Sequence, residues 1–350
     1  MSRPLLYLGD IPVGIGYPPV VVAELGINHN GSLAEAKKIV DSAHAVGCSI
    51  IKHQTHIVED EMSSHAKTVV PSNSTFSIYE IMERCALSEE EEYELKCYIE
   101  SKGMFFLSTP FSRRAVDRLE QFGVQAYKIG SGELSNHPLL HYIASCGKPI
   151  ILSTGMNDII GVKKAVSIIE QYNIPYALMH CTNIYPTPPE DVRLGAMLEL
   201  QREFPNAVIG LSDHTVNNTA CLAAIALGAC IVERHYTDTK ERYGEDIVCS
   251  MDQQELQELL NGASQIFSML HSKKQHKGIV AGEIPTRDFA FATVVAIQDI
   301  YPGEAFTKDN IWVKRPGNIG IPAEEWHTLL GKKSLVFIPK DTHILTTMVE

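Results

Sequence analysis

The sequence predicts a (β/α)8 TIM barrel followed by a small β-rich domain, and three observations support this prediction. Eight short β-branched runs alternate with amphipathic segments over the first 270 residues. The runs are continuously apolar, which is typical of parallel strands covered on both faces. Nearly every run ends in a polar side chain, and barrels place their chemistry at this C-terminal rim. The alternative, a doubly wound open sheet, would instead gather polar residues at one switch point.

The segments between the runs have recognisable helix ends. Ser32 and Glu35 have the spacing of a capping box, and Gly47 supplies a stop. Ser88 precedes the acidic run 89–92, which suits the positive N-terminal end of a helix. We expect the strands at 18–24, 48–54, 104–110, 126–132, 149–155, 176–182, 207–213 and 230–236.

At 350 residues the chain exceeds the size at which one hydrophobic core stops growing, so two domains are expected. We predict a barrel domain at 1–275, an exposed linker at 276–292 and a C-terminal domain at 293–350. Short alternating strands and turns fill the last segment. A domain this small would gain stability by docking on something larger.

Composition narrows the class of partner. Thirty Lys and Arg against 42 Asp and Glu give a net charge of −12, without a long basic stripe, so nucleic acid and anionic membranes are disfavoured. The N-terminal residues lack signal-peptide features, and no apolar run is long enough to span a bilayer. Eight cysteines without a CxxC pair predict buried, reduced thiols in a cytoplasmic protein.

Two histidines are candidate metal ligands. His214 and His235 follow the seventh and eighth predicted strands. Adjacent barrel strands lie about 4.8 Å apart, so both imidazoles can reach one ion. Neutral imidazole suits Mn, Fe, Co, Ni or Zn, and two protein ligands leave positions open for substrate and water. The alternative is that each histidine only hydrogen-bonds within the rim.

Two lysines predict an anion site. Lys52 and Lys128 project from the second and fourth predicted strands. Ammonium groups, hydroxyls and backbone amides together bind phosphate or carboxylate. A strand-end lysine could instead form a Schiff base, as in barrel aldolases. The accompanying hydroxyl residues at the strand ends are Thr109, Ser131, Ser153, Thr154 and Ser212.

Acidic and neutral polar residues complete the predicted face. Glu24, Glu133 and Asp246 can position water or accept hydrogen bonds from sugar hydroxyls. Asn183 and Tyr185 follow the sixth strand and add neutral hydrogen-bonding groups. Each of these alone has an ordinary surface interpretation, and only their joint placement indicates a site.

These residues stand in motifs that resemble the sialic acid synthase family over nearly the whole chain. The C-terminal segment is similar to the antifreeze-like (SAF, β-clip) domain of these enzymes, without implying ice binding. The matching motifs are AELGINHNGS, IKHQTHIVEDEMS, SIYEIMERCAL, FLSTPFS, YKIGSGE, ILSTGM, HCTNIYPTP, GLSDHT, ERHYTD, DIVCSM, AGEIPTRDFAFA and VKRPGN.

The resemblance implies that phosphoenolpyruvate, N-acetylmannosamine and water react to give N-acetylneuraminate and phosphate. It implies that His214 and His235 hold a divalent metal, typically Mn²⁺, on the aldehyde oxygen of the open-chain sugar. Glu24 and Glu133 would line the reacting centre. Arg315 would reach the sugar N-acetyl group from the partner subunit of a domain-swapped homodimer. The implied phosphoenolpyruvate site is Lys52, Thr109, Lys128, Ser131, Ser153, Asn183 and Ser212, and the implied sugar contacts are Gln54, Asn73, Tyr185 and Asp246.

Rival interpretations remain. A synthase of legionaminate or pseudaminate would use a 6-deoxy-2,4-diacetamido sugar with the same fold and mechanism. The long loop 55–80 and the motifs IVEDEM, YEIMERCAL and DIVCSM favour the sialate branch. The segment 241–246, ERYGED, departs from related sequences, which usually have prolines beside the glycine. A non-enzymatic carbohydrate- or ice-binding protein would leave the polar barrel rim unexplained.

Overall fold

The computed structural model describes residues 4–71, 74–273 and 275–350. The chain divides into two compact units, Met1–Lys273 and Lys274–Glu350. Within the segment predicted as a linker, the second unit contains the helix α11 (Ile284–Ala290).

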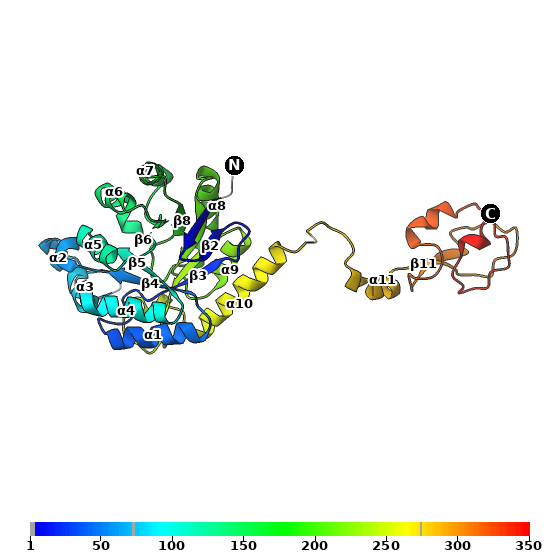
Figure 1. The fold of residues 1–350 in the computed structure, drawn as a ribbon. Coiled ribbons are helices and arrows are strands. Elements are labelled where there is room, and N and C mark those ends of the chain that lie inside the picture. Colours follow the sequence, from blue (N-terminus) through cyan, green and yellow to red (C-terminus); the bar gives the residue numbers. More distant parts are fainter. Residues whose placement is uncertain (1–3, 72–73, 274) are drawn as a thin grey trace. The chain divides into compact units, whose positions relative to one another are not determined.

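A closed parallel barrel of eight strands forms the first unit and confirms the predicted fold (Figure 1). Neighbouring strands pair in the order β10-β3-β4-β5-β6-β7-β8-β9. Apart from Phe105 and Gln54, every residue of these strands is buried, as expected for strands covered on both faces. The strands are β3 (Val20–Glu24), β4 (Ile50–Thr55), β5 (Phe105–Pro110), β6 (Tyr127–Ile129), β7 (Ile150–Ser153), β8 (Tyr176–Cys181), β9 (Val208–Asp213) and β10 (Ile231–His235).

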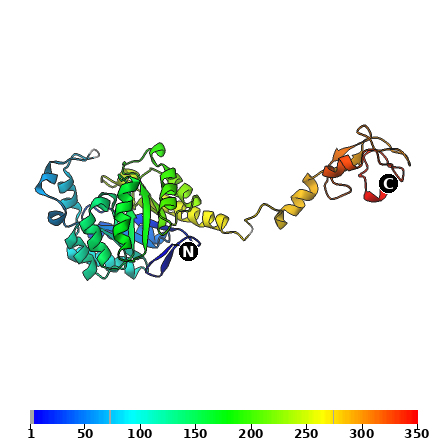
Figure 2. The same cartoon turned by 90° about the horizontal axis from the view of Figure 1, so that it is seen from above.

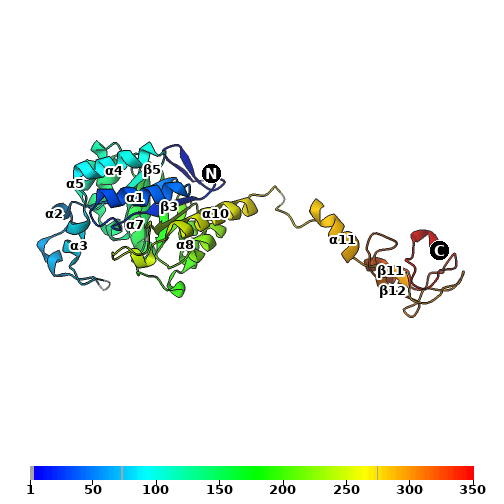
Figure 3. The same ribbon diagram turned by 90° about the horizontal axis from the view of Figure 1, so that it is seen from below.

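Helices surround the barrel and bury their apolar faces on it (Figure 2). Two short helices, α2 (Val58–Glu61) and α3 (Ile78–Cys85), lie at one side, apart from this ring (Figure 3). The surrounding helices are α1 (Leu33–Ala45), α4 (Glu89–Ser101), α5 (Arg113–Gln121), α6 (His137–Ser145), α7 (Ile159–Glu170), α8 (Leu194–Glu203), α9 (Thr219–Ala226) and α10 (Gln253–Leu270).

Both predicted helix starts are present, although one cap differs from the prediction. At Ser88 a full capping box forms, in which the Glu91 carboxylate accepts a hydrogen bond from the Ser88 amide at 3.0 Å. Ser32 accepts a hydrogen bond from the Glu35 amide at 3.4 Å. The Glu35 carboxylate, however, pairs with Lys38 and with Arg242, each at 2.7 Å, instead of returning to Ser32. The capping box predicted there is therefore only half formed, because two cations compete for the carboxylate.

The N-terminal residues form a hairpin that the sequence analysis did not anticipate. β1 (Leu5–Leu8) and β2 (Ile11–Gly14) pair antiparallel around a turn in which Gly9 has φ of +59°. Leu6, Leu8 and Val13 join an apolar cluster with residues from the starts of the barrel strands. The hairpin therefore closes the N-terminal end of the barrel and leaves the opposite end for chemistry.

The second unit has its own small core. β11 (Thr293–Ala296) pairs antiparallel with β12 (Ile311–Lys314), and isolated bridges link several other segments. The buried residues of this core are Val294, Ala296, Ile300, Phe306, Ile311, Ile321, Leu329, Ile338 and Ile344.

Two further findings bear on the sequence analysis. Among the described residues, no helix combines the length and apolar character needed to cross a membrane. All eight cysteines are free, and six are buried. Cys97 is exposed and Cys146 only partly buried, so burial was predicted wrongly for these two.

Candidate active site

A cavity of about 160 Å³ lies at the C-terminal ends of the barrel strands. Most of the residues predicted from the sequence line this one cavity. Those that do are Glu24, Lys52, Gln54, Thr109, Lys128, Ser131, Ser153, Asn183, Tyr185, Ser212, His214 and His235. Lining residues that the sequence analysis did not assign to the site are Phe111, Gly130, Gly132, Cys181 and Glu233.

Strand register brings these side chains together. His235 stands opposite Glu24, and Glu24 stands opposite Lys52 on the next strand. One strand further, Gln54 is paired with Thr109. Because side chains alternate between the two faces of a strand, these registered positions meet at the barrel mouth.

Two lysines and two glutamates form a buried charge cluster in this cavity. Lys52 Nζ lies 2.8 Å from Glu24 Oε1 and 3.6 Å from Glu233 Oε1. Lys128 Nζ lies 3.5 Å from the same oxygen of Glu233. Sequence reasoning left Glu233 out of the site. A usable signal was present, because Glu233 precedes His235 by two residues and so shares its face of β10.

Burial and charge pairing shift the pKa values of these residues in opposite directions, and the stronger effect differs from residue to residue. Burial works to lower the pKa of Lys52, but the Glu233 and Glu24 carboxylates outweigh it, and the pKa is raised. Burial lowers the pKa of Lys128 despite the opposing effect of Glu233. Burial works to raise the pKa of Glu233, but the two ammonium groups hold it below its usual value. Lys52 is therefore firmly protonated, whereas Lys128 holds its proton less tightly.

Hydroxyl and amide groups surround the lysines. Lys128 Nζ donates a hydrogen bond to Ser153 Oγ at 2.7 Å. The Gly155 amide donates to Ser131 Oγ at 3.0 Å. A Cβ at Gly155 would overlap Asn183 Oδ1, so only glycine allows this close approach. The arrangement offers several donors to an anion beside the two ammonium groups.

Several polar atoms of the lining residues are buried without a hydrogen-bond partner. They are Glu24 Oε2, Thr109 Oγ1, Glu233 Oε2 and His235 Nδ1. Buried polar groups are nearly always hydrogen-bonded in folded proteins. A group of unpartnered atoms around one cavity therefore indicates a place for a polar ligand.

The two histidines fit the chemistry of a divalent cation. Their ring centroids lie 5.5 Å apart, and His214 Nδ1 donates to the Thr182 carbonyl at 2.9 Å. That bond leaves the lone pair of His214 Nε2 for a ligand. Burial, and then the nearby His235, lower the pKa of His214 from 6.5 to about 3, so the ring stays neutral. The described residues include no metal-binding group of three or more His, Cys, Asp or Glu.

Of the predicted residues that the structure describes in the barrel unit, Thr154, Glu133 and Asp246 do not line this cavity. Asp246 lines an adjoining cavity, with Oδ2 3.5 Å from His235 Nδ1, and burial raises its pKa. Glu133 lies in the 3-10 turn Ser131–Ser135 after β6, where burial raises its pKa. Arg315 belongs to the C-terminal unit, and Asn73 lies outside the described residues.

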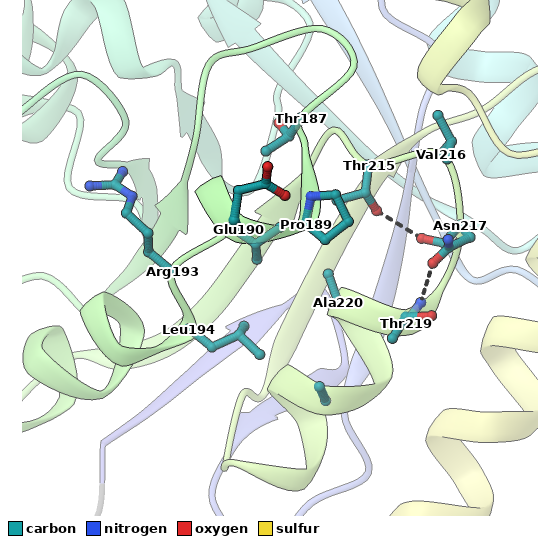
Figure 4. Close-up of a pocket in the computed structure, with 12 residues that line it drawn as sticks. Thr187, Pro189, Glu190, Arg193, Leu194, Thr215, Val216, Asn217, Thr219 and Ala220 are labelled. Carbon is teal, nitrogen blue, oxygen red and sulfur yellow. Dashed lines mark hydrogen bonds between the residues drawn. The ribbon is translucent and has the colours of Figure 1, made fainter.

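Another cavity, of about 470 Å³, lies beside the loops that follow β8 and β9 (Figure 4). Thr215 Oγ1 donates to the Asn217 carbonyl at 2.9 Å, and Asn217 Oδ1 accepts from the Thr219 amide at 2.9 Å. These polar groups are thus used within the loop itself. None of the residues predicted for chemistry lines this cavity, so the barrel mouth is the candidate active site.

Comparison with known proteins identifies the family of the chain. The sequence profile of the NeuB family matches residues 39–275, which include β4 to β10 of the barrel. The chain belongs to the NeuB family. The profile of the SAF domain matches residues 291–350. Both matches confirm the resemblance inferred from the motifs.

Relatives of this NeuB-family chain span nearly its whole length. It is 32% identical to the N,N'-diacetyllegionaminic acid synthase of Legionella pneumophila, over 98% of each chain. It is also 32% identical to the human N-acetylneuraminate-9-phosphate synthase, over 97% of this chain and 94% of that one. A solved N-acetylneuraminic acid synthetase from Leptospira borgpetersenii, 29% identical, superposes with a TM-score of 0.73 over 81% of this chain and 95% of that one.

Proposed function

We propose that this protein condenses phosphoenolpyruvate with N-acetylmannosamine and water, giving N-acetylneuraminate and phosphate. The observation that carries the proposal is the convergence of two lysines, suited to an anion, and two histidines, suited to a cation, on one small cavity. Membership of a family that contains sugar-acid synthases supports the same chemistry.

Phosphoenolpyruvate would bind at the lysines. Its phosphate and carboxylate need cations and hydrogen-bond donors, and Lys52 and Lys128 provide ammonium groups within one cavity. Thr109 Oγ1 has no partner in the described part of the chain and is free to donate to the substrate. Further donors at this end of the cavity are Ser131, Ser153, Asn183 and Ser212.

The open-chain sugar would lie with its aldehyde at the histidines. A divalent ion held by His214 and His235, which we propose to be Mn²⁺, would supply Lewis-acid polarisation of the aldehyde oxygen. Tyr185 packs 4.1 Å from the His214 ring and can orient the sugar beside it. Gln54 and Asp246 both line the adjoining cavity and offer polar groups to the sugar there.

Bond formation then follows from the positions of the two substrates. C3 of phosphoenolpyruvate forms a bond to the aldehyde carbon as its C2–C3 double bond opens, and the former aldehyde oxygen takes a proton from solvent to become a hydroxyl. C2 of phosphoenolpyruvate then accepts the oxygen of a water molecule. Glu24 is placed to take the water proton, because Oε2 is unpartnered while Oε1 is held by Lys52 and by Gln54 Nε2 at 2.7 Å. The tetrahedral carbon collapses to the ketone as its C–O bond to phosphate breaks. Lys52 and Lys128 stabilise the departing phosphate.

The alternative substrate is a 6-deoxy-2,4-diacetamido sugar, which would make the protein a legionaminate or pseudaminate synthase. The relative from Legionella, named as a diacetyllegionaminic acid synthase, favours this alternative. A Schiff-base mechanism at Lys52 is disfavoured, because its ion pairs keep the amine protonated and therefore not nucleophilic. Borohydride in the presence of substrate would trap an imine if one formed.

A substitution experiment tests the proposed reaction. His214→Ala and His235→Ala should each abolish phosphate release from phosphoenolpyruvate and N-acetylmannosamine with Mn²⁺ in excess. His141→Ala, on the exposed face of α6, is the matched control and should behave as wild type. Wild-type turnover by either cavity variant would remove the metal site from the proposal.

We also propose that Arg315 acts on the active site of a partner subunit, in a domain-swapped homodimer. Arg315 is exposed in the C-terminal unit, directly after β12. Arg315→Ala and His214→Ala chains should each be inactive alone. Mixed by unfolding and refolding, they should recover up to about a quarter of wild-type activity, because each heterodimer holds one intact site. Failure to recover activity while heterodimers form would contradict the swap.

A further inference from the structure

A second cavity, of about 500 Å³, adjoins the candidate active site. It shares Gln54, Tyr185 and His235 with the small cavity at the barrel mouth. If the aldehyde carbon of the sugar lies at the histidines, as the proposed function requires, the remaining carbons must extend away from the lysines. The second cavity offers the space for the far end of the sugar.

The wall of this cavity is largely apolar. Ile78, Ile81 and Met82 of α3 line it together with Ile27 and Pro71. Ile81 and Ile27 are buried and belong to a small apolar cluster against which Met82 packs. A full capping box at Ser77 fixes the start of α3. The apolar wall is thus a built surface, and it suits carbon-bound hydrogens better than a charged group.

Carboxylates, without lysine or arginine, accompany the apolar wall. Glu245 and Asp246 are the acidic residues among the described residues that line the cavity, and no lysine or arginine is among them. The nearby Arg84 is already engaged, with Nη2 3.1 Å from both carboxylate oxygens of Glu245. Its guanidinium also lies 5.3 Å from the Phe76 ring centroid. The described residues that line this cavity therefore offer a terminal phosphate no cation to replace its water.

We propose that the cavity walled by α3 and Glu245 is the specificity subsite for the terminal carbons of the sugar, and that it selects an uncharged terminus. A hydroxymethyl or methyl group fits this subsite, whereas a 6-phosphate does not. The subsite lies partly in the segment 241–246, which supplies Glu245 and Asp246. This inference rests on the proposed function and adds the residues that discriminate between sugars.

Three sugars test the subsite on the wild-type enzyme. They are N-acetylmannosamine, its 6-phosphate, and a 6-deoxy-2,4-diacetamido sugar, each assayed for phosphate release and product mass. The 6-phosphate should have a kcat/KM at least about 100-fold below that of the better uncharged sugar, because a buried unpaired charge is rejected strongly. A 6-phosphate turned over as well as either uncharged sugar would overturn the inference and leave the proposed function standing. No product from any of the three would overturn both.

Two variants test the residues themselves. Met82→Lys should raise the ratio of kcat/KM for the 6-phosphate over N-acetylmannosamine by at least about tenfold, because it places a cation on the wall. Ile160→Lys, which adds the same charge on the exposed face of α7, is its control and should leave the ratio unchanged. Glu245→Gln should raise the ratio too, because it releases Arg84. Its control is Glu203→Gln, which breaks the exposed pair of Glu203 with Lys163. Unchanged ratios in both Met82→Lys and Glu245→Gln would overturn the assignment.

Discussion

The buried pair of Asp213 and Arg234 should hold the two histidine loops in place. Asp213 ends β9, directly before His214, and Arg234 lies directly before His235 on β10. Arg234 Nε lies 3.5 Å from Asp213 Oδ2, and the Arg234 side chain is fully buried. Because successive side chains of a strand point to opposite faces, Asp213 and Arg234 point away from the cavity that His214 and His235 line. We predict that breaking the pair destabilises the barrel and weakens metal binding together.

The size of the effect follows from burial and distance. Two unit charges 3.5 Å apart interact by about 5 kcal/mol at an effective dielectric constant of about 20. Loss of one partner of a buried pair typically costs about 3–5 kcal/mol, because the other charge is left unpaired. Asp213→Asn and Arg234→Met should each lower the free energy of unfolding by about that amount. The double variant should cost about 2 kcal/mol less than the sum of the two, because it leaves no unpaired charge.

Urea unfolding followed by circular dichroism at 222 nm measures these changes, because the helices surrounding the barrel dominate that signal. Tryptophan fluorescence would not serve, since Trp312 and Trp326 both lie in the C-terminal unit. Calorimetric titration with Mn²⁺ would then compare metal affinity in variants that remain folded. Additive costs in the double variant, or single costs below about 1 kcal/mol, would refute the reasoning.

Other predictions concern acid stability and the anion site. Burial, with a contribution from His56, lowers the pKa of His29 in the folded protein from 6.5 to about 4. Between these two pH values the unfolded chain binds a proton at His29 that the folded chain does not. The free energy of unfolding therefore falls as the pH falls from 6.5 towards 4. His29→Asn should therefore reduce the loss of unfolding free energy between pH 7 and 4.5 by about 2 kcal/mol, and an unchanged loss would contradict the assignment. Gly155→Ala should raise the Kd for phosphoenolpyruvate at least about tenfold with an unchanged barrel spectrum, since its Cβ displaces Asn183 and Ser131. Wild-type affinity for phosphoenolpyruvate in a direct binding titration would show that the close contact of Gly155 with Asn183 is not needed for binding.

The barrel and most of the site could be predicted from the spacing of apolar residues along the sequence and from the polar residues at the ends of the apolar runs. Continuous apolar runs fix the parallel strands, and polar residues at their ends mark the rim. The N-terminal hairpin was missed because the first residues were tested only for signal-peptide features and not for strands. Its alternating Leu6, Leu8 and Val13 around Gly9 and Asp10 were the available signal.

Other features depend on contacts that a single sequence does not contain. The face of Glu233 could be inferred from its spacing to His235, but its role could not, because that comes from two lysines on other strands, at 3.5 and 3.6 Å. The Glu35 cap failed because Arg242, about 200 positions away, and the nearby Lys38 both pair with its carboxylate. The apolar wall on α3 likewise becomes a subsite only when Glu245 is brought beside it. Pairing between distant segments decides such features, and local patterns cannot reveal it.

The proposed reaction is tested by supplying the metal-stripped protein with phosphoenolpyruvate and N-acetylmannosamine, with and without Mn²⁺. Phosphate release and the mass of the product are measured together. We expect phosphate only with Mn²⁺ and both substrates, matched mole for mole by N-acetylneuraminate. Metal-independent release, or phosphate without a nine-carbon keto acid, would contradict the proposal.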